Sequence, residues 1–587
     1  MELRRTVILI ALAVVSYFLF LNWQQDYAPK PEAAPVAEEQ AVAVDNPAVT
    51  AGAAASVDVP QAVATTPAAS DVPVAVTPPS QALAETAKVS AERGTGGVVR
   101  VSTDVLNVDI DINGGDIVRV ALPAFTRTVD DKTPFVLLDR KPGYSYIAQS
   151  GLVRGIRAAA HGLQGLDDAA SGRPQYQSEQ TAYSLEQGAD SLKVVLRTTT
   201  ADGLQVSKIF GFQRGDYRIH VSYEITNPTT QPWSGVLFGQ IKRDGSKDPS
   251  SENHSFGMVT FLGGAWWTPE KNYNKLALDK FGSEPLSQTV TGGWVAMVQH
   301  YFVSAWVPAK TGTSHISTRS AANGTENYIG FTGSQLTVAP GGTGKIGADF
   351  YAGPKHQDKL EALSPGLELT VDYGFLWPIA QFLFWLLQTI HGFLGNWGWS
   401  IVVLTLLVKA AFFHLSAASY RSMANMRRVM PEMQRMKEKF GSDRAKLSQA
   451  MMELYKKEKI NPLGGCLPIL VQMPVFIALY WTLMESVELR HAGWILWIKD
   501  LSLMDPYFIL PLLMGVTMYV QQQLNPAPQD PVQAKVLKMM PIVFTIFFLW
   551  FPAGLVLYWF VNNLLSIAQQ WVITRQIEKA AAAKSAS

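Results

Sequence analysis

Lys409 is the residue whose type and position most directly suggest chemistry. It lies in the middle of residues 399–413, which otherwise read as a membrane-spanning helix. A cation at the centre of such a helix costs roughly 2.5–3.5 kcal/mol on insertion scales. We therefore expect the ammonium to face a water-accessible cavity inside the membrane. The alternative is a side chain that extends to the cytoplasmic interface, since His414 and Ser416 follow soon after.

Other polar side chains recur within the apolar segments that follow. Thr405 precedes Lys409 by one helical turn, so both point the same way if the segment is helical. Each of the others could bond to a backbone carbonyl or to a neighbouring helix. Together with several prolines they predict a loosely packed bundle that contains a polar groove. These polar residues are Gln472, Tyr558, Asn562 and Asn563, and the prolines are Pro468, Pro474, Pro511, Pro541 and Pro552.

Residues 422–440 and 443–459 predict a helical hairpin, with Ser442 as a candidate N-cap and Pro431 as a kink or interruption. The first helix carries one methionine face: Met423, Met426, Met430, Met433 and Met436. Leu447, Met451 and Leu454 form a matching stripe on the second. The simpler interpretation is that the stripes pack on each other. The more specific interpretation is that the flexible methionines bind varied apolar segments before these enter the bilayer.

The hairpin also has a basic face, formed by Arg427, Arg428, Arg435, Lys437 and Lys439. Such a face could meet lipid head groups or ribosomal RNA. A solvated face that only sets membrane topology explains it equally well. Residues 417–465 hold eleven Lys or Arg against five Asp or Glu. By the positive-inside rule the hairpin and both termini lie in the cytoplasm.

Composition narrows the possible classes of protein. The 587 residues are 48% hydrophobic with a mean hydropathy of +0.08, which is high for a soluble protein and low for an entirely membrane-embedded one. A net charge of +1 gives no global field for DNA. We find no phosphate-binding glycine loop, no metal-type His/Cys spacing and no nucleophile elbow. The sequence therefore favours neither an enzyme nor a bound cofactor or metal.

The middle of the chain predicts strands. Residues 105–112 and 117–122 alternate around Asn113-Gly114-Gly115-Asp116, a hairpin signature. Similar runs recur at residues 191–199, 204–212, 217–225 and 235–241, without a long amphipathic helix between them. A large antiparallel sandwich follows. Trp266, Trp267 and Trp294 either line a ligand cleft or pack in its core.

The apolar runs predict six membrane spans. The last apolar block, residues 541–573, is too long for one span and is broken at residues 551–554, so we expect two short helices there. The resulting division is an anchor at 1–27, an Ala/Pro-rich disordered tether at 28–95, a β-sandwich at 96–350, a linker with an interfacial amphipathic helix at 351–398, a second span at 399–416, the hairpin at 417–465, spans three to six at 466–574, and a cytoplasmic tail at 575–587.

Two motifs resemble the YidC membrane protein insertases. Asn461-Pro-Leu-Gly-Gly-Cys-Leu-Pro468, followed by Gln472-Met-Pro-Val-Phe476, resembles the third-span signature of that family. Residues 547–558 resemble its last hairpin. The order of anchor, tether, β domain and five-span core is similar to the Gram-negative form. The implied fold is an α-helical polytopic membrane protein with an all-β periplasmic sandwich domain.

The resemblance implies an inner-membrane insertase and chaperone that acts alone or with the Sec translocon. Its clients would be nascent hydrophobic membrane proteins. Its partners would include Sec auxiliary subunits, membrane lipids and possible ribosome contacts. Lys409 matches the family's groove cation, which is Arg in many relatives, so a bidentate fork is absent here. Thr405, Gln472, Tyr558 and Trp559 align with groove-lining positions.

Two other classes of function stay open from the residues alone. A transporter could use Lys409 as an anion site, although we see no inverted repeat across the spans. A membrane-tethered periplasmic carbohydrate-binding module would need a histidine and an acid that converge in a sandwich cleft. The candidates for that histidine are His220, His254 and His300.

Overall fold

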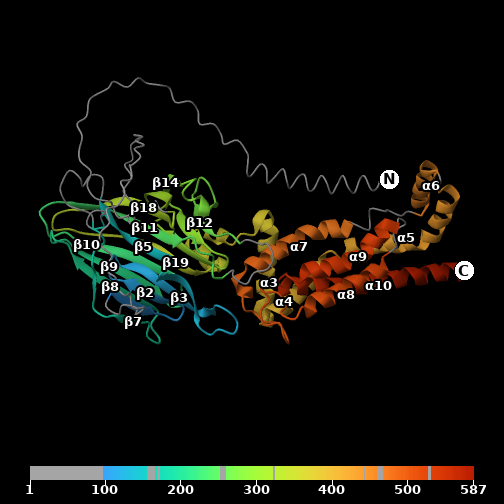
Figure 1. Cartoon of the computed structure of the whole chain (residues 1–587), viewed down its shortest axis with the longest axis horizontal. Coiled ribbons are helices and arrows are strands. Elements are labelled where there is room, and N and C mark those ends of the chain that lie inside the picture. Colours follow the sequence, from blue (N-terminus) through green and yellow to red (C-terminus); the bar gives the residue numbers. More distant parts are fainter. Residues whose placement is uncertain are drawn as a thin grey trace, which may run out of the picture. The chain divides into compact units, whose positions relative to one another are not determined.

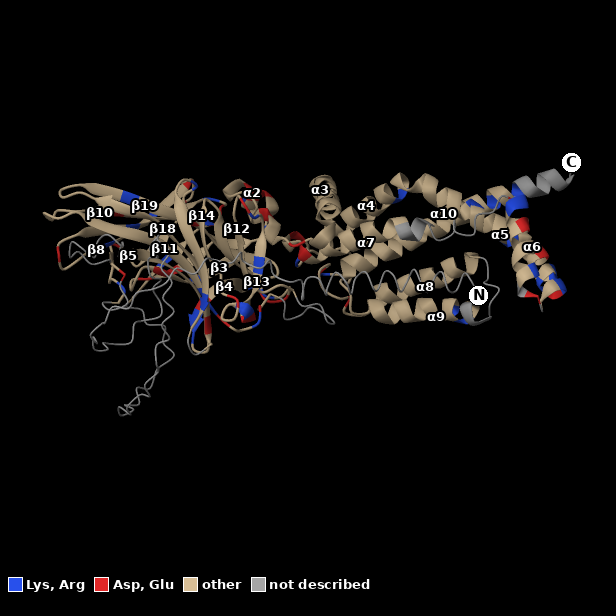
Figure 2. Cartoon of the chain, turned by 90° about the horizontal axis from the view of Figure 1, so that it is seen from above, with Lys and Arg blue, Asp and Glu red and all other residues tan. Residues whose placement is uncertain are grey.

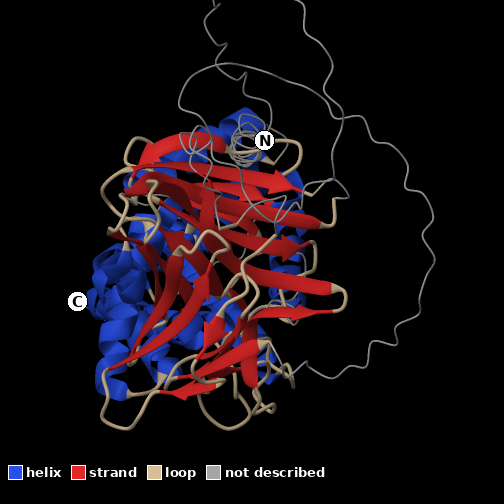
Figure 3. Cartoon of the chain, turned by 90° about the vertical axis from the view of Figure 1, so that its left-hand side faces the viewer, coloured by secondary structure: helices blue, strands red, loops and turns tan. Residues whose placement is uncertain are grey.

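The computed structural model describes residues 97–154, 166–167, 172–250, 260–321, 324–441, 443–458, 467–525 and 531–586. The expected anchor at 1–27 and tether at 28–95 lie outside these residues, as do Ser442 and His254. Strands occupy the first part of the described chain and helices the second (Figures 1 and 3). No single described helix is both long and apolar enough to cross a membrane, but Trp397–Ala411 and Phe413–Phe440, bent by 68°, meet that criterion as a pair.

The strands form two sheets. The larger has the order β14-β17-β18-β11-β5-β4-β3-β2-β1-β7, and the smaller β13-β12-β15-β16-β19-β10-β9-β8-β6. The strands are β1 Val98–Ser102, β2 Asn107–Asp111, β3 Asp116–Thr126, β4 Pro134–Lys141, β5 Tyr144–Arg154, β6 Gln177–Ser178, β7 Ala182–Ser184, β8 Ser191–Thr199, β9 Gln205–Gln213, β10 Arg218–Thr226, β11 Trp233–Asp244, β12 Gly263–Trp267, β13 Asn274–Ala277, β14 Ser287–Thr291, β15 Trp294–Val298, β16 Phe302–Val307, β17 Thr313–Ser320, β18 Glu326–Val338 and β19 Thr343–Pro354.

The predicted strand pattern is confirmed in most respects. β2 and β3 pair antiparallel around the Asn113–Asp116 turn, where Gly114 and Gly115 adopt positive φ. One pair departs from the expected antiparallel order, because the edge strand β7 pairs with β1 in parallel. Trp294 is fully buried, and Trp266 and Trp267 are half-buried against the same core. Core packing is therefore the correct interpretation of these tryptophans.

A buried cluster of charges lies inside the sandwich. The Arg173 guanidinium pairs with Asp116 and Asp167, each at 2.6 Å. The Lys208 ammonium donates to the carbonyl oxygens of Gly114 at 2.9 Å and Ser150 at 3.0 Å. The formal charges of the two acids and the two bases cancel. Burial nevertheless lowers the pKa of Lys208 to about 7, against the opposing pull of Asp116.

The helical part begins after β19. Its elements are α2 Gln357–Leu363, η3 Leu367–Thr370, η4 Gly374–Leu376, α3 Trp377–Leu394, α4 Trp397–Ala411, α5 Phe413–Phe440, α6 Arg444–Lys457, α7 Leu467–Glu485, η6 Val487–Leu489, α8 Ile509–Leu524, α9 Pro531–Phe548 and α10 Ala553–Ala586, with η2 Leu278–Lys280 inside the β domain. α10 contacts α4, α5, α7 and α8, which makes it the central helix of this part.

The helices depart from the sequence expectations in two places. The helix expected at residues 399–416 is two helices that meet at Phe412, where the Phe413 carbonyl accepts from Gln569 of α10 at 3.2 Å. The N-cap of α6 is Asp443, which accepts from the Lys446 backbone N–H at 3.1 Å. Pro431 lies inside α5 without ending it.

The predicted break in the last apolar block is confirmed between α9 and α10, but neither helix is short. α10 has 34 residues and continues through the segment expected to be a tail. The Ala553 and Gly554 N–H groups donate to the carbonyls of Leu503 and Leu501, at 2.7 and 2.9 Å. These bonds satisfy N–H groups that a helix start otherwise leaves without partners.

The β domain and the helical part meet through polar contacts. His300 contacts the Met484 carbonyl at 3.0 Å, and His356 contacts the Glu488 carboxylate at 3.0 Å. The Arg490 guanidinium donates to the carbonyl of Arg127 at 3.1 Å. The segment after α7 therefore makes most of these contacts.

We predict that Lys208 makes folding less favourable at neutral pH than at alkaline pH. The unfolded chain keeps its lysines protonated up to about pH 10.4, whereas buried Lys208 loses its proton near 7. Between these values the unfolded state binds more protons, so stability rises with pH by at most about 1.4 kcal/mol per unit from this group. Melting temperatures of the full chain at pH 7 to 10 measure the slope.

The slope should flatten in Lys208→Met. Lys193→Met, at an exposed position on the adjacent strand β8, is the matched control and should keep the wild-type slope. Equal slopes in all three proteins would contradict the assignment.

Candidate functional site

The Lys409 ammonium points toward α10 and contacts it. It lies in the last turn of α4, is half-buried, and donates to the Ser566 hydroxyl at 2.8 Å. Ser566 in turn donates to the carbonyl of Asn562 on its own helix at 2.7 Å. The cation is therefore joined to a hydroxyl, and no carboxylate pairs with it among the described residues.

A second set of contacts joins α7 to α10. The Gln472 amide donates to the Asn562 side-chain oxygen at 2.7 Å and reaches the Tyr558 hydroxyl at 3.5 Å. Tyr558 and Asn562 are buried, while Gln472 is half-buried. Asn562 therefore links both sets, because its amide oxygen meets Gln472 and its carbonyl meets Ser566. We call Lys409, Gln472, Tyr558, Asn562 and Ser566 the polar cluster.

The two remaining predicted groove residues do not hydrogen-bond to the polar cluster. The Thr405 hydroxyl is buried and donates to the carbonyl of Ile401 on its own helix at 2.7 Å. The Trp559 ring packs on Phe476 with ring centres 4.9 Å apart, and its buried N–H has no partner among the described residues. Lys409, Gln472, Tyr558 and Asn562 therefore meet in the polar cluster, whereas Thr405 and Trp559 make their contacts outside it.

Ser566 is the member that the sequence reasoning missed. Tyr558, Asn562, Ser566 and Gln570 recur every four residues and are all buried on α10. That spacing places them on one helix face. A search of the last apolar block for a polar stripe of helical period would have found Ser566 together with Asn562.

The methionines of the α5–α6 hairpin occupy two different apolar clusters. Met433 is buried with Val429 and Leu454, and Met426, Met436 and Met451 pack around them. Met423 packs instead with Tyr420 and Ile573 of α10. Met430 is half-buried and belongs to neither cluster. The two stripes do contact each other across the hairpin, as the simpler interpretation expects.

Lys and Arg residues are frequent along α5, α6 and the end of α10 (Figure 2). Arg427 and Lys437 are exposed. Arg428 pairs with Glu458 at 2.6 Å, although its side chain stays 52% exposed. An exposed pair of this kind contributes little stability, so Arg428 still presents its charge to solvent.

Two protein-family models and several named proteins match this chain. A model of the YidC periplasmic domain matches residues 98–386, and a model of the 60Kd inner membrane protein matches residues 389–580. The membrane protein insertase YidC of Stutzerimonas stutzeri is 55% identical over 587 residues, which is 99% of this chain and 100% of that protein. That of Azotobacter vinelandii is 55% identical over 585 residues, with 99% and 100% covered. The chain belongs to the YidC family of membrane protein insertases.

A crystal structure described as an active YidC insertase with its first transmembrane domain resolved matches 81% of this chain and 94% of its own, at 18% identity and a TM-score of 0.35. Membership in the YidC family assigns an inner-membrane location and a periplasmic domain. The polar cluster and the hairpin both fall within the part matched by the 60Kd inner membrane protein.

We predict that Gln472 and Asn562 are energetically coupled. Gln472→Leu leaves the buried Asn562 oxygen without its donor, which costs about 1–3 kcal/mol. The double variant Gln472→Leu/Asn562→Leu removes both partners, so its loss should be smaller than the sum of the two single losses. Thermal unfolding in detergent measures the coupling, expected at about 0.5–3 kcal/mol. Gln381→Leu, at an exposed position of α3, is the control, and strict additivity would refute the coupling.

Proposed function

We propose that the polar cluster is the floor of a client groove, and that Lys409 receives the acidic outer tail of an incoming membrane protein. The supporting observation is the Lys409–Ser566 contact, which holds a cation within an apolar helical bundle without a carboxylate partner among the described residues. A hydroxyl satisfies one N–H of the ammonium but does not neutralise its charge. The site therefore favours the binding of a negatively charged group.

The electrostatic gain is sufficient to guide a short tail. A unit charge pair at 4 Å is worth about 4 kcal/mol at an effective dielectric of 20. That gain is of the same order as the roughly 2.5–3.5 kcal/mol that one acidic residue costs at the centre of a membrane helix. Lys409 would therefore lower the barrier to moving a short acidic tail without any nucleotide.

The apolar segment of the client would then move into lipid beside α7 and α9. α9 exposes a series of large apolar side chains, which include Val536, Ile542, Val543, Ile546 and Phe547. Transfer of apolar surface from water yields about 25 cal/mol per Å². This transfer supplies the net driving force for insertion, while Lys409 lowers the barrier to moving the acidic tail.

The α5–α6 hairpin would meet the client first. Met426, Met436 and Met451 are only partly buried between the two helices, and Met452 is 62% exposed on α6. The exposed Arg427 and Lys437 would meet lipid head groups or ribosomal RNA. In this proposal six spans cross the membrane, and both termini and the hairpin lie in the cytoplasm. The protein inserts some clients alone and others together with the Sec translocon.

We predict that charge at position 409 determines the insertion of clients with acidic tails. In liposomes that contain the purified chain, Lys409→Gln should reduce protease protection of an acidic-tailed single-span client by about tenfold or more, since a lost charge contact exceeds 1.4 kcal/mol. Lys409→Arg should retain most activity because the charge remains. The same client with a neutral tail should be affected little.

Lys538→Gln is the matched control, because it removes an exposed lysine from α9, outside the polar cluster. Comparable melting temperatures for the three variants would separate insertion from folding. If Lys409→Gln inserts acidic and neutral tails as well as the wild type does, the electrostatic role is wrong.

A further inference from the structure

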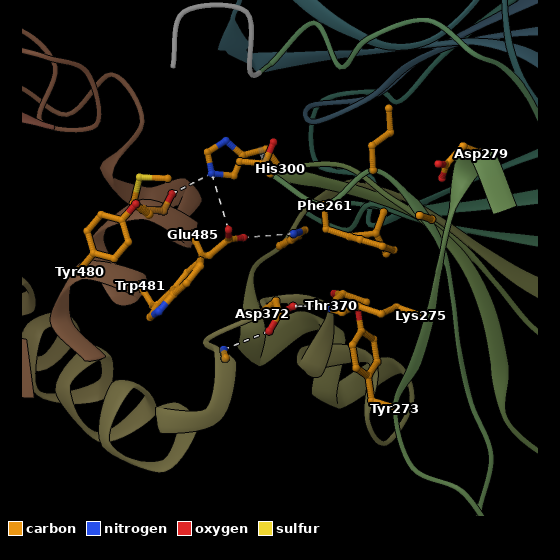
Figure 4. A pocket seen from close by; sticks show the side chains of 17 residues that line it. Phe261, Tyr273, Lys275, Asp279, His300, Thr370, Asp372, Tyr480, Trp481 and Glu485 are labelled. Carbon is orange, nitrogen blue, oxygen red and sulfur yellow. Dashed lines mark hydrogen bonds and ion pairs between the residues drawn. The ribbon is translucent and has the colours of Figure 1, made fainter. Parts of the chain in front are cut away.

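A cavity of about 610 Å³ lies where the β domain meets the end of α7. Its volume is within the range of small-molecule sites, and water alone would need about twenty molecules to fill it. β-domain residues such as Tyr273 and Lys275 line one side, and Tyr480, Trp481 and Glu485 of α7 line the other (Figure 4). It is separate from the polar cluster, which shares no residue with it.

The inner end of the cavity is lined by buried ionisable side chains. The Lys355 ammonium is 3.6 Å from one Glu485 oxygen, and His300 Nε2 is 3.9 Å from the other. The side chains of Lys355 and Glu485 are 2% and 8% exposed. Burial lowers the pKa of Lys355, which marks the cost of keeping this charge away from water. Because the Lys355–Glu485 distance is longer than a hydrogen bond, the ammonium and the carboxylate keep hydrogen-bonding capacity for a polar ligand group.

The outer rim is also charged but more open. Lys275 pairs with Asp372, and their side chains are 43% and 33% exposed. Asp279, also exposed, adds a second acid on the same rim. The cavity therefore presents both signs of charge at both depths. A ligand with charge of one sign only would be repelled by the groups of the same sign.

Two buried phenol groups indicate that the cavity accommodates a hydrogen-bonding occupant. The hydroxyls of Tyr273 and Tyr480 are buried and have no partner among the described residues. Burial raises the pKa of Tyr273, so its hydroxyl stays protonated and remains a donor. An unsatisfied buried donor is costly in a native protein, and a ligand acceptor is one way to satisfy it.

The rim continues into an exposed apolar helix face. Gly374 lines the cavity, and the next residue, Phe375, is 69% exposed. Beyond it α3 exposes Trp377, Phe382, Trp385 and Phe393. Aromatic side chains of this kind favour the membrane interface. A molecule with its polar end in the cavity could lay an acyl chain along this face.

We propose that this cavity binds the head group of a zwitterionic phospholipid from the periplasmic leaflet. Its phosphate would meet Lys275, Lys355 and the Tyr273 hydroxyl, and its ammonium would meet Asp279, Asp372 or Glu485. The acyl chains would lie against α3. The bound lipid would join the β domain to the helical part at their boundary. The proposal does not depend on the route taken by clients.

The test is lipid retention by the full chain, purified in detergent, delipidated, and re-supplied with equimolar phosphatidylethanolamine, phosphatidylglycerol and phosphatidylcholine. Native mass spectrometry should show one phosphatidylethanolamine bound in preference to the other two, because only it combines an anion with N–H donors. Free phosphoethanolamine at millimolar concentration should not displace it. Displacement would show that the head group alone is the ligand and would overturn the lipid assignment.

Tyr273→Phe removes a buried hydroxyl that has no hydrogen-bond partner among the described residues, so the protein should fold. Its affinity for the lipid should fall about three- to tenfold. Tyr507→Phe, at an exposed position outside the cavity, should change nothing. The rim variant Lys275→Gln/Asp372→Asn keeps the net charge and should erase the preference between the three lipids. Unchanged retention in both cavity variants, or no head-group preference in the wild type, would overturn the proposal.

Discussion

The helical part depends on one physical constraint, which is that a polar group removed from water needs a partner inside the protein. α10 supplies several of those partners. Its buried stripe places Asn562 and Ser566 beside Gln472 of α7 and Lys409 of α4. Gln569 and Gln570 of the same helix bond to the Phe413 carbonyl and to the end of α8. Four helices are therefore positioned against one another by the polar side chains of a fifth.

This arrangement explains how a cation is tolerated where an apolar helix is expected. The Ser566 hydroxyl provides a hydrogen-bond acceptor but no negative charge, so the site stays positive. A carboxylate partner would neutralise Lys409 and, in the function that we propose, would remove its attraction for an acidic client tail. The hydrogen bond from Lys409 to Ser566 of α10 limits the cost of this incompletely compensated charge.

The loop between α7 and α8 also supplies partners for buried polar groups, at the other end of the helices. The fully buried Asp505 carboxylate accepts from the Trp497 indole N–H at 3.0 Å and from the backbone N–H of Leu510 at 2.7 Å. The same loop supplies the carbonyls that start α10. Because His300 and His356 contact the end of α7 and the residues just after it, the β domain and the helix ends are organised by one short segment.

Residue types and spacing alone determined the division into β and helical parts, most of the strands, the break before α10 and the polar positions of three helices. These features follow from local period and composition, which the chain carries without reference to its fold. Tertiary structure decided the partner of Lys409, the division of one expected helix at Phe412, the parallel edge strand β7, and the cavity beside Glu485. Each of these arises where residues far apart in sequence meet, as at Lys409 and Ser566. Period and composition describe neighbours along the chain, so they specify that a buried cation needs a partner but not which distant side chain provides it.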